Sequence, residues 1–218
     1  QLLPPLERRI AELEAERTAL SRALAASTAP TVSVVIVTLD GRHHLERCLP
    51  ALFATTGARL EVVVVDNGSR DGTLEWLEAS WPQVKVIPLA NNLGFGEANR
   101  RGIAAARSEW IALLNNDTEV EPGWLEALLR PMLTDPSIAA ACSVLELMHH
   151  PGVLNAHGGG MSWLGYGFDR AFGRPLSMLA DEPLLHDVIF PTAAAMLMRR
   201  SDFDAVGGFD RAFLMYHE

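Results

Sequence analysis

Side chains that could bind a metal ion gather at Asn115-Asn116-Asp117, directly after the apolar run Trp110–Leu114. A carboxylate beside amide oxygens offers the hard ligands that Mg²⁺ or Mn²⁺ prefers. One protein carboxylate, together with diphosphate oxygens and waters, is a normal environment for such an ion. The alternative is a loop that only caps the following helix. The residues favour a metal site with Asp117 as its ligand.

Two further polar segments follow apolar runs earlier in the chain. Thr38–Asp40 follows Val32–Val37, and Asp66–Ser69 follows Leu60–Val65. A carboxylate at the end of a strand can accept a hydrogen bond from a nucleobase edge, and a neighbouring glycine lets backbone approach closely. An Asp-Gly turn with Asp71 capping the next helix is the structural alternative. It accounts fully for Asp71, and for Asp66 the two interpretations are balanced.

A glycine loop at Asn91–Asn99 leads into a predicted helix. It is not a dinucleotide fingerprint, because Asn99 stands where the third glycine belongs and the loop follows the third predicted strand. The free N–H groups of such a loop can still bind an anion at the helix N-terminus. Arg100 or Arg101 could reach a phosphate there. The alternative for both is a solvated arginine on a helix surface.

The elements that must position these segments alternate from Thr31 onward. Continuous apolar strands separated by helices are typical of an α/β fold with a mainly parallel sheet and helices on both faces. Ligands of such sheets bind beyond the carboxyl ends of the strands. The predicted strands are Val32–Thr38, Leu60–Val65, Val84–Pro88, Trp110–Leu114 and Ala193–Met198. The predicted helices are His43–Ala54, Gly72–Ser80, Gly96–Arg107, Pro122–Leu133 and Ser201–Val206.

Local signals set the ends of two of these helices. Pro122 is expected in the first turn of its helix, where a missing N–H costs nothing. Ser201 is expected to cap the last helix, and Gly207-Gly208 to end it.

The regular pattern continues to Ile138–Ser143 and then stops. Residues 149–187 are rich in Gly, Pro, His and aromatic residues and show no strong period. A loop-rich stretch of this length is usually functional, so a substrate-facing surface is expected there. His149, His150 and His157 lack the spacing of a metal site on a helix, and we interpret them as loop residues.

The first residues differ from all that follow. Between residues 5 and 26, leucine and isoleucine recur at alternating spacings of four and three, and charged residues fill the other positions. This pattern predicts an amphipathic, coiled-coil-like helix. It leaves self-association and docking onto a neighbouring domain equally open. A linker ends at Pro30, which divides the chain into residues 1–30 and a domain over residues 31–218.

Composition excludes several classes of protein. The chain has 218 residues, 49% of them hydrophobic, which is globular composition. A net charge of −9 argues against a nucleic-acid partner. No apolar run reaches a membrane-spanning length, and no secretory signal begins the sequence. Cys48 and Cys142 show no metal-ligand spacing and are interpreted as small side chains in a reducing compartment. The expected location is cytoplasmic, with peripheral attachment to the inner face of the membrane as an option.

Five motifs also occur in a familiar order. They are VSVVIVT at 32–38, VVVVDNGS at 62–69, NNLGFGEAN at 91–99, LLNNDT at 113–118, and VGGFD with FLMYHE at 206–218. In this order they resemble the inverting family 2 glycosyltransferases of the GT-A fold, especially their rhamnosyltransferase-like branch. The resemblance covers residues 31–218.

The resemblance implies an enzyme that binds a nucleotide-diphospho-sugar, such as a UDP- or dTDP-sugar, across the first half of the sheet. Its acceptor would be a glycan or a lipid-linked sugar, bound by residues 163–169 and 190–194. Matching positions imply a metal ligand at Asp117 and a catalytic base at Glu218. The implied donor-binding residues are Thr38, Leu39, Asp40, Asp66, Gly96, Asn99, Asn115 and Asn116.

The chain departs from the family pattern at three places. Leu39 stands where a tyrosine usually stacks on the base, and Asn115 replaces the first Asp of the metal motif. The sequence stops at Glu218, one residue before an expected Asp, so either Glu218 or that neighbour would be the base. We therefore expect the domain to be truncated at its C-terminus. His217 is interpreted as a spacer beside this carboxylate.

Two other functions compete with glycosyl transfer. A nucleotidyltransferase would need a Gly-rich, basic loop after the first strand, but Leu39–Arg42 is too short and too acidic. The second is a catalytically incomplete sugar- or nucleotide-binding module, or a scaffold, tethered through the N-terminal helix.

Overall fold

In the computed structural model, residues 29–180 and 185–210 are described. The predicted amphipathic helix at residues 5–26 lies outside this part of the chain, and so do His217 and Glu218. Among the described residues, none of the helices combines the length and the apolar character needed to cross a membrane.

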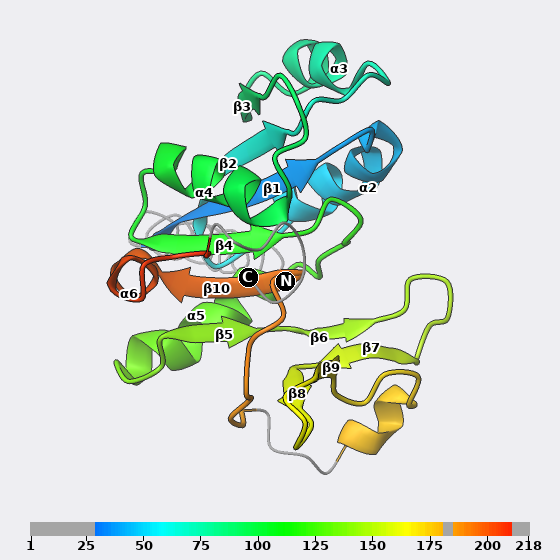
Figure 1. Ribbon diagram of the computed structural model, residues 1–218, viewed down its shortest axis with the longest axis vertical. Helices are drawn as coiled ribbons and strands as arrows, with labels where there is room; N and C mark the ends of the chain where they lie inside the picture. Colours follow the sequence, from blue (N-terminus) through cyan, green and yellow to red (C-terminus); the bar gives the residue numbers. More distant parts are fainter. Residues whose placement is uncertain (1–28, 181–184, 211–218) are drawn as a thin grey trace, which may run out of the picture.

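Four parallel strands form the first half of the central sheet (Figure 1). They are β1 (Thr31–Thr38), β2 (Arg59–Asp66), β3 (Lys85–Pro88) and β4 (Trp110–Leu114). Two further strands complete the sheet, β5 (Ala140–Cys142) and β10 (Ala195–Arg199), and the order is β3-β2-β1-β4-β10-β5. β1, β2 and β4 are runs of β-branched and other apolar residues that are almost entirely buried, as a sheet covered on both faces requires. The predicted strands and their parallel arrangement are confirmed.

Helices cover both faces of this sheet. α2 (Arg42–Phe53), α3 (Thr73–Ser80) and α5 (Trp124–Thr134) share one core cluster with Val34 and Ile36 of β1. α4 (Phe95–Ala105) and Phe203 of α6 (Arg200–Ala205) belong to the second cluster, around Val35. Alternate residues of β1 thus face opposite layers.

Close packing of α4 on the sheet depends on a glycine. A Cβ at Gly102 would lie 2.3 Å from Cγ1 of Val35, so a larger residue would push the helix away from β1.

The last strand of the sheet runs against the others. β10 (Ala195–Arg199) lies between β4 and β5 (Ala140–Cys142) and is antiparallel to both. Direction is decided by long-range pairing, which apolar periodicity does not encode, so the sequence predicted this strand but not its orientation.

Two predicted helix starts are wrong. Pro122 precedes α5, and its carbonyl instead accepts a hydrogen bond from the Thr56 N–H at 2.6 Å. α6 begins at Arg200 without a side-chain cap, so Ser201 does not cap it. The predicted glycine stop is confirmed, since Gly207 and Gly208 have φ of 87° and 71°.

Residues 144–180 form a small lobe beside the main sheet (Figure 1). Two short antiparallel ribbons build it, together with the 3₁₀ helix η1 (Leu176–Leu179). The strands are β6 (Val144–Glu146), β7 (Leu154–His157), β8 (Gly159–Met161) and β9 (Gly167–Asp169). The expectation of a loop-rich stretch missed these ribbons, because strands of three or four residues carry almost no period.

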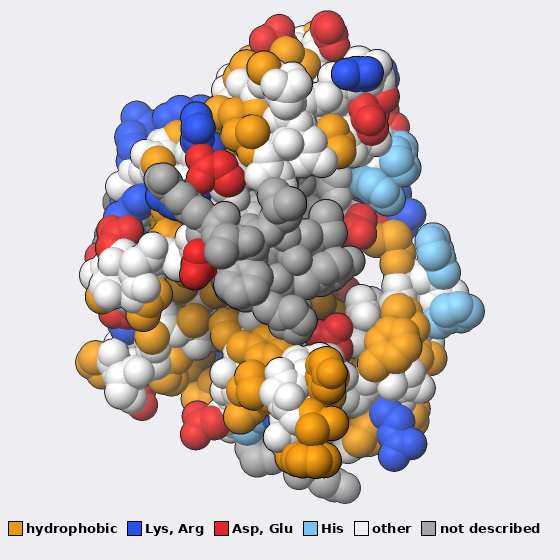
Figure 2. Space-filling model, viewed as in Figure 1, with side chains coloured by type: hydrophobic (Ala, Val, Ile, Leu, Met, Phe, Trp, Pro, Cys, Tyr) orange, Lys and Arg blue, Asp and Glu red, His pale blue; other side chains and the backbone are white. Residues whose placement is uncertain are grey.

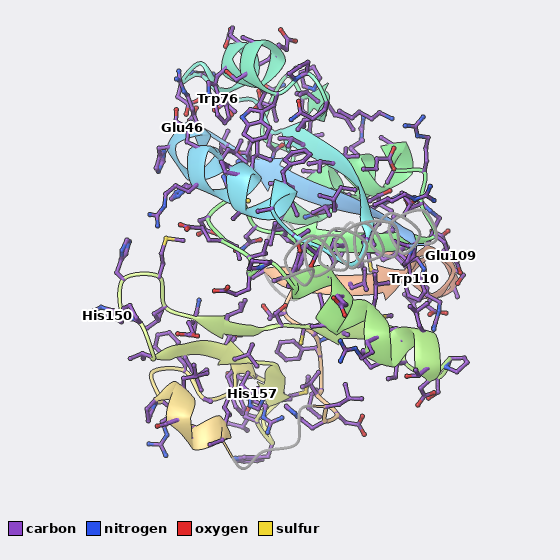
Figure 3. All side chains as sticks on the ribbon, turned by 180° about the vertical axis from the view of Figure 1, so that it is seen from behind. Glu46, Trp76, Glu109, Trp110, His150 and His157 are labelled. Atoms are coloured by element: carbon purple, nitrogen blue, oxygen red, sulfur yellow. The ribbon has the colours of Figure 1, made fainter. Side chains whose placement is uncertain are left out.

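His157 is a further correction. It lies buried on β7, not in a loop, and its ring centroid is 4.3 Å from that of His186. Seen from behind, Figure 3 places His157 inside the small lobe and His150 at the far end of the β6–β7 turn.

Two consecutive arginines tie the helical layers to the sheet. Arg199 donates to the carbonyls of Met132, Pro136 and Ile138, at the end of α5. Arg200 donates to the carbonyls of Ile103, Ala106 and Ser108, at the end of α4. The guanidinium of Arg199 also lies 5.0 Å from the ring centroid of Trp110, labelled in Figure 3. Each arginine satisfies carbonyls that a helix C-terminus leaves free.

Candidate functional site

Three neighbouring strands end at the same edge of the sheet. Thr38 at the end of β1 pairs in register with Asp66 at the end of β2, and β4 lies on the other side of β1. The segment Asn115–Asp117 follows directly from β4. The structure therefore brings together the strand-end residues that the sequence singled out.

A hydrogen bond joins the ends of β1 and β4. The side-chain N–H of Asn116 donates to the hydroxyl of Thr38 at 2.8 Å. Gly41 lies against this contact, because a Cβ there would be 2.2 Å from Nδ2 of Asn116 and 2.4 Å from Oγ1 of Thr38. The sequence did not single out Gly41, whose role depends on residues far away in the chain.

Asp40 connects the loops after β1 and β2. Its Oδ1 accepts the N–H of Arg70 at 2.7 Å, and its own N–H donates to Oγ of Ser69 at 2.9 Å. Asp40 has a φ of 49°, a left-handed conformation that Asp tolerates better than most residues. Leu39 beside it is 42% exposed and leaves an apolar surface at the site.

Asp71 reinforces the connection between the same two loops. Its carboxylate accepts the N–H groups of Arg42 and Thr73 at 3.2 and 3.1 Å. Burial alone would raise the pKa of Asp71, but hydrogen bonds from Thr73 and Arg42 outweigh it and lower the pKa. Gly72, and not Asp71, is the N-cap of α3, so the predicted N-cap position is wrong by one residue. Asp71 still accepts the N–H of Thr73, the first residue of the helix.

Asp66 is buried, with 3% of its surface exposed. Its Oδ1 accepts the N–H of Ser69 at 3.0 Å across the Gly68 turn. Of the two interpretations of Asp66, a turn-forming residue or a contact to a nucleobase, the turn is therefore observed, and it engages one of the two carboxylate oxygens.

An asparagine pair, unforeseen from the sequence, holds the glycine loop against β2. Asn67 accepts the N–H of Leu93 at 2.9 Å and donates to Oδ1 of Asn92 at 2.8 Å. Asn92 in turn accepts the N–H of Gly94 at 2.9 Å. The only sequence signal was the clustering of Asn beside Gly in both motifs. This network places the start of α4 beside the end of β2.

Gly96 and Asn99 are buried in the first turns of α4. The amide of Asn99 donates to the Phe95 carbonyl at 3.0 Å within the same helix. Arg100 and Arg101 both approach Glu97, at 3.9 and 2.8 Å. The ion pairs favour the solvated-arginine interpretation over phosphate contact.

The environment of Asp117 suits a cation. Asp117 is exposed at the sheet edge. Beneath its loop, burial raises the pKa of the Cys48 thiol to about 12, and the charges of Asp117 and Glu119 add to this rise. The negative potential felt by Cys48 is one that a divalent ion would neutralise. Over residues 29–180 and 185–210, no three His, Cys, Asp or Glu side chains group as a metal site. Asp117 offers one protein carboxylate, and an ion held there would complete its shell with ligand oxygens.

The loop after β4 also contacts the predicted acceptor segment. Asn115 donates its N–H to the Ala194 carbonyl at 2.9 Å. The other predicted acceptor segment, residues 163–169, lies in the small lobe outside the six-stranded sheet.

A shallow hollow of about 570 Å³ lies on the α3 side of the Asp40–Ser69 contact. Arg42, Arg70 and Trp76 line it, and the guanidinium of Arg42 lies 5.7 Å from the ring centroid of Trp76. Trp76 is labelled in Figure 3. The lining of the hollow includes neither Thr38 nor Asp66 nor Asp117, so this hollow does not coincide with the strand ends.

Comparison with known proteins gives one family. A family model described as Glycosyl transferase family 2 matches residues 33–207. The chain is 31% identical over 209 residues to the N-acetylglucosaminyl-diphospho-decaprenol L-rhamnosyltransferase of Mycobacterium tuberculosis, covering 85% of this chain and 66% of that protein. It is 37% identical over 101 residues to the succinoglycan biosynthesis protein ExoO of Rhizobium meliloti, covering 46% of this chain and 29% of that protein.

Among solved structures, the chain resembles the mannosyltransferase PcManGT of Pyrobaculum calidifontis, solved in complex with GDP-Man and Mn²⁺. The TM-score is 0.57 at 18% identity, over 86% of this chain and 50% of the other. This likeness shows a common fold.

Proposed function

The chain belongs to glycosyl transferase family 2, and from that premise we propose that it moves a sugar from a nucleotide-diphospho-sugar to an acceptor hydroxyl with inversion. The GT-A fold and the rhamnosyltransferase-like character expected from the sequence are confirmed by the relatives. The chain spans just under two thirds of the mycobacterial relative's length, so reaction, substrates and partners are proposals.

The observation that carries the proposal is the convergence of three strand ends. Thr38, Asp66 and the Asn115–Asp117 segment meet at one edge of a parallel sheet, joined by the Asn116–Thr38 hydrogen bond. Open parallel sheets bind nucleotides at this edge. The buried Asp66 has one carboxylate oxygen committed to Ser69, and we assign the other to a base N–H.

Leu39 is exposed, and we assign to it an apolar contact with the nucleoside in place of an aromatic ring. We assign Thr38, Asp40, Asn115 and Asn116 to the floor of the donor site, and Gly96 and Asn99, both buried on α4, to its wall. Because Asp40 and Asn116 already make hydrogen bonds within the protein, their contribution is mainly to shape the floor.

We assign the divalent ion, Mg²⁺ or Mn²⁺, to Asp117. When bound, such an ion neutralises the departing diphosphate as a Lewis acid. Asn115 and Asn116 hold the Asp117 loop in place through the Ala194 carbonyl and Thr38.

The acceptor hydroxyl needs a base, and we propose Glu218 or the residue after it. The base removes the hydroxyl proton while the oxygen attacks the anomeric carbon opposite the diphosphate, which inverts that centre. Glu218 lies outside the described residues, so this assignment stays a prediction.

A UDP- or dTDP-sugar is the proposed donor, and a glycan or a lipid-linked sugar the proposed acceptor. The name of the mycobacterial relative describes transfer to a diphospho-decaprenol carrier, which supports a lipid-linked acceptor. A peripheral position at the inner face of a membrane would follow from such an acceptor.

Calorimetric titration with nucleoside diphosphates tests the proposal. We expect UDP or dTDP to bind in the presence of Mn²⁺, and Mn²⁺ alone to bind weakly because only one protein carboxylate holds it. Asp117→Asn is expected to reduce the metal-dependent gain in affinity at least about tenfold. Glu126→Gln is the matched control, since Glu126 pairs with Arg130 on the exposed surface of α5, away from the strand ends.

Two results would contradict the proposal. The absence of nucleoside-diphosphate binding with either metal would remove the glycosyltransferase assignment. Donor binding without diphosphate release, in an acceptor screen on a protein extended past Glu218, would favour the incomplete binding module.

A further inference from the structure

Large apolar side chains are exposed together on the small lobe. Eight of the fifteen exposed large hydrophobic residues of the described chain fall between residues 161 and 178. Figure 2 shows hydrophobic atoms gathered over the part of the molecule where Figure 1 places β8, β9 and η1. Protein surfaces rarely expose so many apolar side chains in one place unless they meet a partner. Six of them lie on the β8–β9 hairpin and just after it: Met161, Trp163, Leu164, Tyr166, Phe168 and Phe172.

The hairpin is built to hold these side chains outward. Ser162 and Tyr166 close its turn, with the Ser162 N–H donating to the Tyr166 carbonyl at 2.8 Å and the Tyr166 N–H donating to Oγ of Ser162 at 3.0 Å. At the tip, Trp163 is 92% exposed, Tyr166 70% and Leu164 61%. Because these side chains are so exposed, the tip protrudes from the lobe and suits a partner into which it can insert.

Charge on this segment differs from that of the chain. Arg170 and Arg174 follow the apolar tip closely in the sequence, whereas the lobe over residues 144–180 is neutral in total, with Glu146 and Asp169 against these two arginines. Two arginines beside an apolar tip add local attraction to a negatively charged surface.

We propose that the β8–β9 tip, residues 161–168, inserts into the interface of a bilayer that contains anionic lipids, with Arg170 and Arg174 facing the headgroups. Trp and Tyr favour the boundary between headgroups and acyl chains, where one end of the ring is apolar and the other wet. Arginines beside the buried part add attraction to anionic lipid. The inference rests on the proposed function in one respect, since a lipid-linked acceptor places the reaction at a bilayer.

Vesicle sedimentation with the full chain tests this surface. We expect binding to phosphatidylglycerol–phosphatidylcholine vesicles, weaker binding to phosphatidylcholine alone, and a blue shift of the Trp163 emission that Trp163→Phe removes. The triple variant Trp163→Ser/Leu164→Ser/Tyr166→Ser should bind about tenfold less or weaker. Arg170→Gln/Arg174→Gln should lose severalfold, and only on the anionic vesicles.

The matched control is Leu133→Ser/Val206→Ser, which removes exposed apolar side chains outside the lobe and should leave vesicle binding unchanged. Circular dichroism and calorimetric UDP binding show whether each variant is folded. If the full chain binds neither kind of vesicle, or if the triple variant binds as tightly as the unsubstituted chain, the proposal is wrong. A dimer that the triple variant alone dissociates, without vesicle binding, would assign the surface to a second copy.

The outcome is separable from the proposed function. A chain that binds vesicles through this tip but no nucleoside diphosphate would contradict the glycosyltransferase proposal and leave the membrane surface standing.

Discussion

The Asn116–Thr38 hydrogen bond at the end of β1 depends on a residue that does no chemistry. Gly41 has a φ of −114°, which any residue can adopt, so only the space around its Cβ requires glycine there. The site thus relies on a close approach of two chain segments, the end of β1 with Gly41 and the loop after β4 with Asn116.

Gly41→Ala should therefore disrupt the floor of the site. The added methyl would collide with the Asn116 amide and the Thr38 hydroxyl, costing about 1–3 kcal/mol of unfolding free energy. Nucleoside-diphosphate affinity should fall at least about tenfold, because the Asp117 loop shifts. Chemical denaturation and calorimetric titration measure the two effects.

Gly123→Ala is the control for this substitution. Gly123 also precedes a helix and has a φ of −92°, but a Cβ there meets nothing within 4 Å. Equal losses in both variants would argue against a steric role for Gly41.

At this scale the sequence predicted which side chains end each strand, and the structure brings Thr38, Asp66 and Asn116 to one edge as expected. It did not predict Gly41 or Asn67. Asn67 bonds to Asn92, 25 positions away, and Gly41 lies against Asn116 from a distant part of the chain, which no local pattern encodes.

Among the elements, β2 is fastened to its neighbours through Glu61. Its carboxylate accepts hydrogen bonds from the Ser33 hydroxyl on β1 and from the N–H and Nε of Arg107 at 2.8 and 2.9 Å. Burial would raise the pKa of Glu61, but the hydrogen bonds from Ser33 and Arg107 outweigh it and lower the pKa.

Glu61→Gln should therefore cost stability in a pH-dependent way. A lowered pKa means that the carboxylate stabilises the fold above the unfolded-state value near 4.3 and loses that effect as pH falls through the folded-state value. We expect a loss of about 1 kcal/mol at neutral pH, allowing for solvent screening, that disappears as the pH falls through the lowered folded-state pKa of Glu61. Urea denaturation across this range measures it.

Glu126→Gln should behave differently, because Glu126 only pairs with Arg130 on an exposed helix surface. A pH-independent loss in Glu61→Gln would contradict the electrostatic explanation.

Arg199 and Arg200 join opposite helical layers to one strand end. Arg200→Ala would remove one donor from three carbonyls near the end of α4, of which the Ile103 carbonyl keeps the Ala106 N–H at 3.2 Å, and we expect a loss of about 2–3 kcal/mol. Arg130→Ala, which removes an exposed arginine of α5, should cost about 0.5 kcal/mol or less. Comparable losses in thermal unfolding would mean that the carbonyl contacts contribute little.

The elements themselves divide by length. Most strands and helices of the main sheet were predicted, because their β-branched runs and helical periods are distinctive. β6, β7, β8 and β9 have three or four residues each and gave no signal.

Viewed as a whole molecule, the protein joins a well-packed sheet to a thin lobe. β1, β2 and β4 are buried between two core clusters, whereas the β8–β9 ribbon has two strands and an exposed apolar tip. Two-stranded ribbons are marginally stable.

Hydrogen exchange should reveal this difference. Amides of β1, β2 and β4 are expected to exchange only on global unfolding, and those of β8 and β9 through local opening, at least about a hundredfold faster. Mass spectrometry of peptic peptides measures both. Equal protection of the two regions would show that the lobe opens only with the sheet.

The position of β10 has a consequence for synthesis on the ribosome. Every strand-end residue of the site, from Thr38 to Asp117, belongs to β1, β2, β4 or the loops after them, and this part emerges first. β10 then inserts between β4 and β5, pairing Ala195 with Leu114 and Met196 with Cys142. Until Arg199 has emerged from the ribosome, the edge of β4 that later pairs with β10 has no partner strand in the nascent chain. Such an edge invites pairing with other chains, so the stretch of translation between Cys142 and Arg199 is the interval in which this protein most needs a chaperone.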